Sequence, residues 1–289
     1  MGTAAASAGL TGPMVVAPSC GLKGVTMTDL STPGDPAPAS ALPVIGQVTL
    51  ADLWACLRAG LADFRAAPQF GLFFSAVYVL GGFGMLWLGA GTVAWTLATS
   101  LGFPLVAPFA AAGLYEVSRR IEAGKPLLWA DILGVLWHER TRQIPWAGAI
   151  IVIYFLFWTF LAHLIFALFM GLSPTTRIWD SWQMFLTPDG LIMIAMQLGV
   201  GGVLAFVLFA LTVVSLPLLL EKEVDFVSAM LLSFRMVIAN RGVMLVWAGI
   251  IAGLALLALL PWFLGLVIVL PVLGHATWHL YRRALHDPD

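Results

Sequence analysis

The chain has 289 residues, of which 61% are hydrophobic and only 10% are charged, and its formal net charge is -1. Soluble domains carry about 25% charged residues, and a soluble fold could not bury this much apolar surface. The lack of a basic stripe argues against a nucleic-acid partner. The composition therefore predicts an integral membrane protein, with the lipid bilayer as a partner that covers part of its apolar surface.

The N-terminal segment differs in composition from the rest of the chain. Residues 1–48 are rich in Ala, Gly, Pro, Ser and Thr and lack hydrophobic periodicity, which predicts a disordered tail. No basic segment precedes their short apolar stretch, so a secretory signal is not predicted. The polar run Met27-Thr28-Asp29 suggests the hypothesis that translation starts at Met27. We expect one membrane domain at 49–285 and a short C-terminal tail at 286–289.

Apolar stretches of about 20 residues are long enough to cross a bilayer as a helix. The chain contains six of them, which predicts an all-α polytopic bundle with six transmembrane helices. Their ranges are roughly 70–89, 92–114, 146–170, 191–218, 243–261 and 263–281. The fourth stretch is long, and we expect it to tilt or to break near Pro217.

Basic residues alternate between the connections of these predicted spans. The turn after the first span has none, whereas the next connection carries Arg119, Arg120, Lys125, Arg140 and Arg142. By the positive-inside rule, the alternation places both termini in the cytoplasm. Tryptophans near the span ends predict aromatic belts at headgroup depth, with Trp247 and Trp278 in the inner one.

A segment with amphipathic helical spacing precedes each pair of spans. The first starts with a capping-box-like pair, Thr49 and Asp52, and ends at Pro68. The second span of each pair carries proline: Pro104 and Pro108, then Pro217, then Pro271. This order predicts three repeats of one amphipathic interfacial helix and two spans, although amphipathic inner loops are common to six-span proteins. The interfacial helices are expected to lie on the inner leaflet or to pack beneath the bundle.

Three stretches of the chain carry a family resemblance. They are FRAAP at 64–68, LYEVSRR at 114–120 and LPVLGHATWHLYRR at 270–283. They resemble DUF2189, a family of proteobacterial integral membrane proteins of unknown function, over roughly residues 48–285. The resemblance implies a multi-pass protein of the bacterial inner membrane with no established activity. Some members of such families are labelled as cytochrome c oxidase subunits, but this chain lacks the number of spans and of histidine ligands that the catalytic subunit needs.

Few side chains could carry chemistry. His275 and His279 are four residues apart and share a helix face, which would suit two metal ligands, and Glu116 or Glu221 could supply a third. The simpler interpretation is that the histidines are hydrated or hydrogen-bonded and that Glu116 forms local ion pairs with the arginines that follow it. We therefore predict no catalytic residue, no cofactor and no metal, and retain these four residues as the only metal candidates.

The predicted spans contain almost no ionisable groups, whereas pumps and transporters usually keep charges within the membrane. No nucleotide-binding, hydrolase or carboxylate-dyad motif is present, so no enzymatic activity is expected. The leading hypothesis is a non-catalytic accessory, assembly or scaffold component of a membrane complex, with other membrane proteins as partners. One alternative is a transporter or channel for a small or lipid-like substrate, built on proline-broken helices. Another is a redox or metal-binding protein associated with a respiratory oxidase.

Overall fold

The computed structural model describes residues 42–88, 103–171 and 185–287, and all of them belong to the compact unit Ala39–Asp289. Most of the predicted tail, from residue 1 to 41, lies outside these ranges. So does the part of the second predicted span that precedes residue 103. The described chain is almost entirely helical, as composition and periodicity predict.

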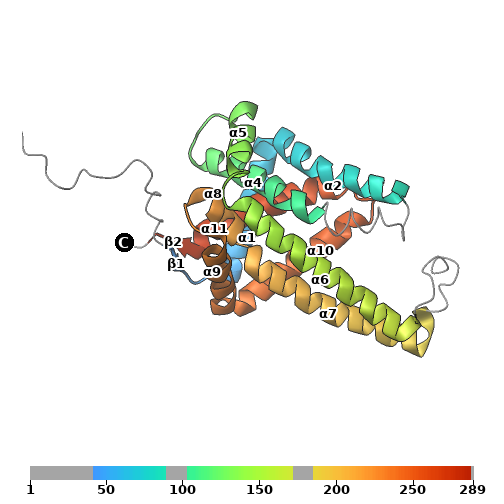
Figure 1. The fold of residues 1–289 in the computed structure, drawn as a ribbon. Coiled ribbons are helices and arrows are strands. Elements are labelled where there is room, and N and C mark those ends of the chain that lie inside the picture. The colour runs from blue at the N-terminus through green and yellow to red at the C-terminus, as the bar shows by residue number, and fades with distance from the viewer. Residues whose placement is uncertain (1–41, 89–102, 172–184, 288–289) are drawn as a thin grey trace, which may run out of the picture. The chain divides into compact units, whose positions relative to one another are not determined.

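The helices follow one another in three similar groups (Figure 1). In each group a short helix is followed by a long apolar helix and then by a proline-bearing segment. The first group is α1 (Leu50–Ala66), α2 (Pro68–Leu88) and α4 (Phe103–Glu122). The second is α5 (Trp129–Glu139), α6 (Ile144–Met170) and α7 (Pro188–Thr212) with α8 (Ser215–Glu221). The third is α9 (Phe226–Ala239), α10 (Arg241–Leu259) and α11 (Leu266–Ala284). This is the element order that the repeat hypothesis predicts.

Local sequence signals set the ends of several helices. Thr49 and Asp52 form the predicted capping box of α1, in which each side chain accepts a hydrogen bond from the other residue's backbone N–H. Asp225 caps α9 by accepting from the N–H of Ser228. Pro68 begins α2 because its fixed backbone angle suits a first helical turn.

The predicted break near Pro217 is confirmed. α7 ends at Thr212 and α8 begins at Ser215, because the ring of Pro217 would clash with the carbonyl of Val213 in a continuous helix. Ser233 of α9 satisfies backbone groups at the break, accepting from the N–H of Val214 and donating to the carbonyl of Ala210. The short helix of the third group therefore stabilises the broken helix of the second.

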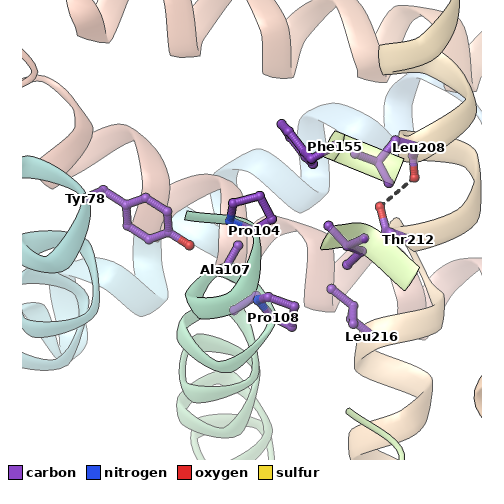
Figure 2. Close-up of a pocket in the computed structure, with 10 residues that line it drawn as sticks. Tyr78, Pro104, Ala107, Pro108, Phe155, Leu208, Thr212 and Leu216 are labelled. Carbon is purple, nitrogen blue, oxygen red and sulfur yellow. Dashed lines mark hydrogen bonds between the residues drawn. The ribbon is translucent and has the colours of Figure 1, made fainter. Parts of the chain in front are cut away.

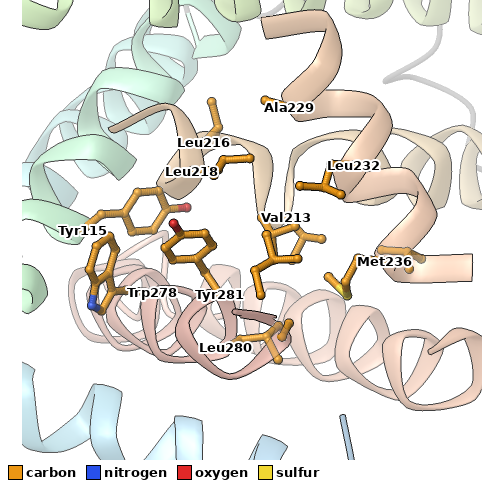
Figure 3. Close-up of a cluster of buried hydrophobic side chains, with 14 of the residues drawn as sticks. Tyr115, Val213, Leu216, Leu218, Ala229, Leu232, Met236, Trp278, Leu280 and Tyr281 are labelled. Atoms are coloured by element: carbon orange, nitrogen blue, oxygen red, sulfur yellow. The ribbon is translucent and has the colours of Figure 1, made fainter. Parts of the chain in front are cut away.

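The core lies where the last helices of the three groups meet. α4, α8 and α11 contact one another, and Figure 3 shows Tyr115 of α4, Leu216 and Leu218 of α8, and Trp278 of α11 in one buried cluster. α9 adds Ala229, Leu232 and Met236 to it. This central packing joins segments that are far apart in sequence.

Each short helix packs against the last helix of another group: α5 on α4, α9 on α7 and α8, and α1 on α11. The first group thereby contacts the third, and two short strands from the two ends of the described chain add to this contact. β1 (Val44–Ile45) pairs antiparallel with β2 (Leu285–His286). Both ends of the described chain therefore lie together.

This closure corrects the predicted inner boundary of the tail. Val48 donates its N–H to Asn240 Oδ1 at 2.8 Å, and Gly46 donates to the carbonyl of Ala284 at 2.8 Å. Residues 42–48 thus belong to the folded unit, as do Leu285 and His286 at the other end of the chain. Local composition could not indicate this, because every partner is distant in sequence.

Four helical segments in the described ranges are long and apolar enough to cross a membrane. They are Pro68–Trp87, Ile144–Met170, Pro188–Glu221 and Arg241–Leu259. The predicted sixth span, 263–281, largely coincides with α11, which is absent from this set because its second half is too polar. The structure thus supports a helical membrane bundle but does not confirm six spans.

Two tryptophans correct the predicted inner belt. Trp247 and Trp278 are fully buried, and the indole N–H of Trp278 donates to Glu122 Oε2 at 3.0 Å. Trp54, Trp137 and Trp146 are exposed, as a belt requires. Position along a span was a poor guide for Trp278, because neighbouring helices cover it.

Candidate functional site

A buried polar cluster lies where α1, α4 and α11 meet. Asp63 Oδ2 accepts a hydrogen bond from Ser118 Oγ at 2.7 Å and lies 2.8 Å from His279 Nε2. Ser118 Oγ also lies 2.8 Å from His275 Nδ1. Asp63, Ser118 and His275 are buried, and the side chain of His279 is 20% exposed. Side chains from three helices thus form one connected hydrogen-bond network.

The Ser118 hydroxyl links Asp63 to His275 within this network. The Ser118 hydroxyl donates to Asp63, and His275 Nδ1 lies within hydrogen-bonding distance of the same serine oxygen. His275 Nε2 is buried and has no hydrogen-bond partner among the described residues. The resulting chain runs from His275 through Ser118 and Asp63 to His279 at the edge of the bundle. This arrangement can orient the two histidines and hold α1 to α11.

A close approach of two helices positions Asp63. A Cβ atom on Gly60 would lie 2.6 Å from both the Ala276 nitrogen and the Val272 carbonyl oxygen of α11. Only glycine allows the two backbones to come this near. Asp63, one turn further along α1, is thereby brought against His279.

Glu116 forms the ion pairs that its sequence spacing predicts. Its carboxylate oxygens lie 2.6 Å from Arg119 Nη2 and 2.7 Å from Arg120 Nε, and Arg120 also reaches Asp131 of α5 at 2.9 Å. The side chain of Glu116 is only 1% exposed, which its place near a helix end did not predict. Its charge is neutralised beneath the surface, and the cluster ties α4 to α5.

Glu221, at the end of α8, belongs to a third network. It accepts from the hydroxyl of Tyr281 and lies 3.0 Å from Arg282 Nη1. Arg282 also reaches Glu122 of α4, which receives the indole N–H of Trp278. These contacts join α4, α8 and α11 at their C-terminal ends.

The four metal candidates therefore fall into three separate networks. His275 and His279 share the first, Glu116 is in the second, and Glu221 is in the third. Within the described ranges, no three His, Cys, Asp or Glu side chains are arranged to hold a metal ion. Each candidate side chain instead has partners within the protein that stabilise the packing of helices.

Asp63, Ser118 and Glu122 are the functional residues that sequence reasoning missed. For Asp63 a signal was present, because Leu53, Cys56, Gly60 and Asp63 recur at helical spacing and are all buried. A carboxylate on the buried stripe of an amphipathic helix must find a partner, since an unpaired buried charge is very costly. No comparable pattern marks Ser118.

An apolar pocket lies beside the break between α7 and α8 (Figure 2). It has a volume of about 380 Å³, and Figure 2 shows Pro104 and Pro108 of α4 facing Thr212 and Leu216 across it. Tyr78 and Phe155 complete much of the wall. The hydroxyl of Thr212 donates to the carbonyl of Leu208, so the lining offers little polar chemistry. The pocket suits an apolar group.

The fold and its polar networks define a helical integral membrane protein whose charged side chains mainly join its own helices. A family model described as a predicted integral membrane protein, DUF2189, matches residues 95–221. The predicted resemblance is thus confirmed, over less of the chain than expected: the LYEVSRR stretch lies inside the match, whereas the stretches at 64–68 and 270–283 lie outside it. The family description gives no function. No curated protein and no solved structure matches the chain.

Proposed function

We propose that this protein is a non-catalytic scaffold or accessory component of a larger membrane complex in the bacterial inner membrane, with both termini in the cytoplasm. The pairing of β1 with β2 supports the common side of the termini, because it requires an even number of membrane crossings between them. The basic residues near these strands favour the cytoplasmic side.

The exposure of the long helices is the observation that carries this proposal. Only 11% of the apolar window of α6 and 17% of that of α10 are buried within the protein. Both helices are apolar on all sides, so lipid or helices of other proteins must cover them. Two spans with so little internal packing leave wide faces for partners.

α10 also carries a face suited to close helix packing. Gly249 and Gly253 form a GxxxG pair, and a Cβ atom on either would meet no other atom within 4 Å. Small residues at this spacing let the backbones of two membrane helices approach closely. Gly60 is used in this way inside the protein, whereas the pair on α10 is left for an external helix.

The experiment is gentle extraction from native membranes followed by affinity purification and mass spectrometry. We expect defined partner proteins to co-purify, and Gly249→Leu with Gly253→Leu to reduce their recovery severalfold. Gly84→Leu is the matched control, because Gly84 on α2 also has open space around its Cβ position. Recovery of the wild-type protein without any partner would contradict the proposal, as would equal recovery for the double variant.

The apolar pocket favours a second candidate function, the transport or binding of a lipid-like substrate. The pocket lies beside a broken helix, and discontinuous helices form substrate sites in known transporters. Ala107→Phe would fill it, since Ala107 is part of its wall. If this function holds, the variant should lose binding of a fluorescent fatty acid by the reconstituted protein, whereas the exposed Ala252→Phe variant should retain it. Unchanged binding by Ala107→Phe would contradict it.

A further inference from the structure

The lysine and arginine side chains of the described residues divide into two classes. The first class has carboxylate partners and lies at the C-terminal ends of α4, α8 and α11 or just before α6. Its members are Arg119, Arg120, Arg142, Lys222, Arg282 and Arg283. The others are exposed and have no carboxylate partner within the described ranges. We call these the unpaired basic residues: Arg58, Arg65, Lys125, Arg140, Arg235 and Arg241.

The carboxylates of the same region are already occupied. Asp52 pairs with Arg283, and Asp287 pairs with Lys222. Asp225 is used as the cap of α9. Among the described acidic residues, Asp189 alone has no such partner, and it lies at the start of α7, away from the short helices. The unpaired basic residues therefore carry positive charge that no nearby acid neutralises.

Exposed apolar side chains line the same short helices. α1 presents Leu50 and Trp54, α5 presents Leu133 and Trp137, and α9 presents Val227, Leu231, Phe234 and Ile238. Their spacing of three and four residues places each set on one helix face. These faces point away from the core, since the opposite faces of α1 and α9 are the buried ones.

On or just after each short helix an arginine lies about one turn after a residue of the apolar stripe. Arg58 comes four residues after Trp54, Arg140 three after Trp137, and Arg235 four after Leu231. The guanidinium carbon of Arg140 lies 3.4 Å from the centroid of the Trp137 ring. Apolar contact and free positive charge thus share one face on all three helices.

The position of these faces along the chain matches the membrane surface. α1, α5 and α9 each lead directly into one of the candidate spans, α2, α6 and α10. The unpaired residues Arg65, Arg140 and Arg241 lie at or within a few residues of the starts of those spans. Side chains at this depth meet lipid headgroups.

We propose that the outer faces of α1, α5 and α9 form a binding surface for anionic phospholipid. The tryptophan and leucine side chains enter the leaflet, and the unpaired basic residues bind the negatively charged headgroups. Lipid fits better than an acidic protein segment, because the apolar stripes lie beside the starts of membrane spans, where acyl chains are the local solvent. The surface would give the protein a preference for anionic over zwitterionic lipid.

The test uses the full chain reconstituted into vesicles of phosphatidylcholine mixed with phosphatidylglycerol. After gentle detergent extraction, native mass spectrometry gives the ratio of the two lipids retained by the protein. Phosphatidylglycerol should be enriched over its share of the vesicle, and added salt should reduce the enrichment by screening. The triple variant Arg58→Gln, Arg140→Gln and Arg235→Gln should reduce it roughly tenfold, since each basic residue adds to the attraction.

The same three positions changed to lysine provide the matched control. Lysine keeps the charge, and all three arginines are exposed and lack carboxylate partners, so both triple variants should fold as the wild type does, as checked by thermal unfolding. The lysine variant should keep most of the enrichment. Equal enrichment in the glutamine variant would overturn the proposal. The proposal would also be overturned if the glutamine variant kept the wild-type lipid ratio but recovered less of a partner protein when purified from native membranes, because that would assign the surface to a protein partner.

Discussion

At the scale of single residues, Asp63 organises the polar cluster. Two side chains, from Ser118 on α4 and His279 on α11, share its Oδ2 atom. A buried carboxylate with two partners fixes the positions of both, and removing it would take this acceptor from the Ser118 hydroxyl and from His279 Nε2. The cluster therefore acts first as a joint between helices.

We predict that Asp63→Ala destabilises the protein by about 2–3 kcal/mol, because Ser118 and His279 lose a charged acceptor in a buried setting. Thermal unfolding in detergent measures the effect. Asp63→Asn keeps one acceptor oxygen and should lose less. If the alanine variant unfolds at the wild-type temperature, the cluster does not join the helices.

Cys56 provides a second residue-scale prediction, on reactivity. It is fully buried on the face of α1 that packs against α11, and burial raises the pKa of its thiol to about 11. Since this pKa lies above the ordinary value, the thiol is neutral at physiological pH and becomes thiolate only as the pH approaches 11.

In a Cys20→Ser variant, maleimide should therefore label Cys56 very slowly at neutral pH and rapidly once the protein is unfolded in dodecyl sulfate. Gel shift with a polyethylene-glycol maleimide measures the rate. A third variant, Cys20→Ser with Cys56→Ser and Thr49→Cys, supplies an exposed thiol as the control. Fast native labelling of Cys56 would mean that α1 does not pack on α11 as described.

At the scale of elements, the contact between α1 and α11 depends on glycine. The Gly60 position meets backbone atoms of α11, which cannot move aside as a flexible side chain can. The same helix pair carries Asp63 and His279, so the polar cluster needs the close approach.

We predict that Gly60→Ala destabilises the protein by about 2 kcal/mol, because overpacking forces the two backbones apart. Gly134→Ala on α5 is the matched control, since its Cβ position is open. There alanine should be neutral or stabilising by up to about 1 kcal/mol, because it favours the helix. Chemical or thermal unfolding of both variants gives the comparison, and equal effects would exclude the tight contact.

At the scale of the whole molecule, three groups of helices close into a ring through α1 on α11 and through β1 on β2. Asn240 adds to this closure, because its side chain bonds to the backbone of both Val48 and Gly46. The closure keeps the two ends of the described chain together.

We predict that Val44→Cys and His286→Cys form an intramolecular disulfide under mild oxidation, in a background without Cys20 and Cys56. These positions face each other in the β1–β2 pair. Non-reducing electrophoresis detects the bond. Val44→Cys with Leu264→Cys, in the turn between α10 and α11, is the control and should not cross-link. If the cysteines at positions 44 and 286 do not cross-link, the two ends are not adjacent, and the argument for an even number of membrane crossings is lost.

Much of the fold was predictable because it depends on local sequence. The capping box at Thr49, the start of α2 at Pro68 and the break before Pro217 are each set by nearby residues. The apolar runs of α2, α6, α7 and α10 are long enough to indicate membrane helices by themselves. The recurring proline-bearing segments indicated the three groups.

The candidate site could be predicted only in part. The helical spacing in the sequence places His275 and His279 on one helix face. It also predicts the ion pairs of Glu116 with Arg119 and Arg120. It could not indicate that Glu116 is buried, or that Asp63 binds His279 across 216 positions of the chain. Such pairs depend on which helices pack together, and no local pattern records that.

The sequence by itself determined that this is a helical membrane protein, where most of its helices begin and end, and which faces are apolar, because the hydrophobic effect and backbone sterics act over short stretches of chain. Only the tertiary structure decided which charges are paired and which remain free, that α11 is central and buried, and that residues 42–48 join the fold. Those outcomes depend on contacts between distant segments. They distinguish the internal polar networks of this protein from its exposed basic and apolar side chains.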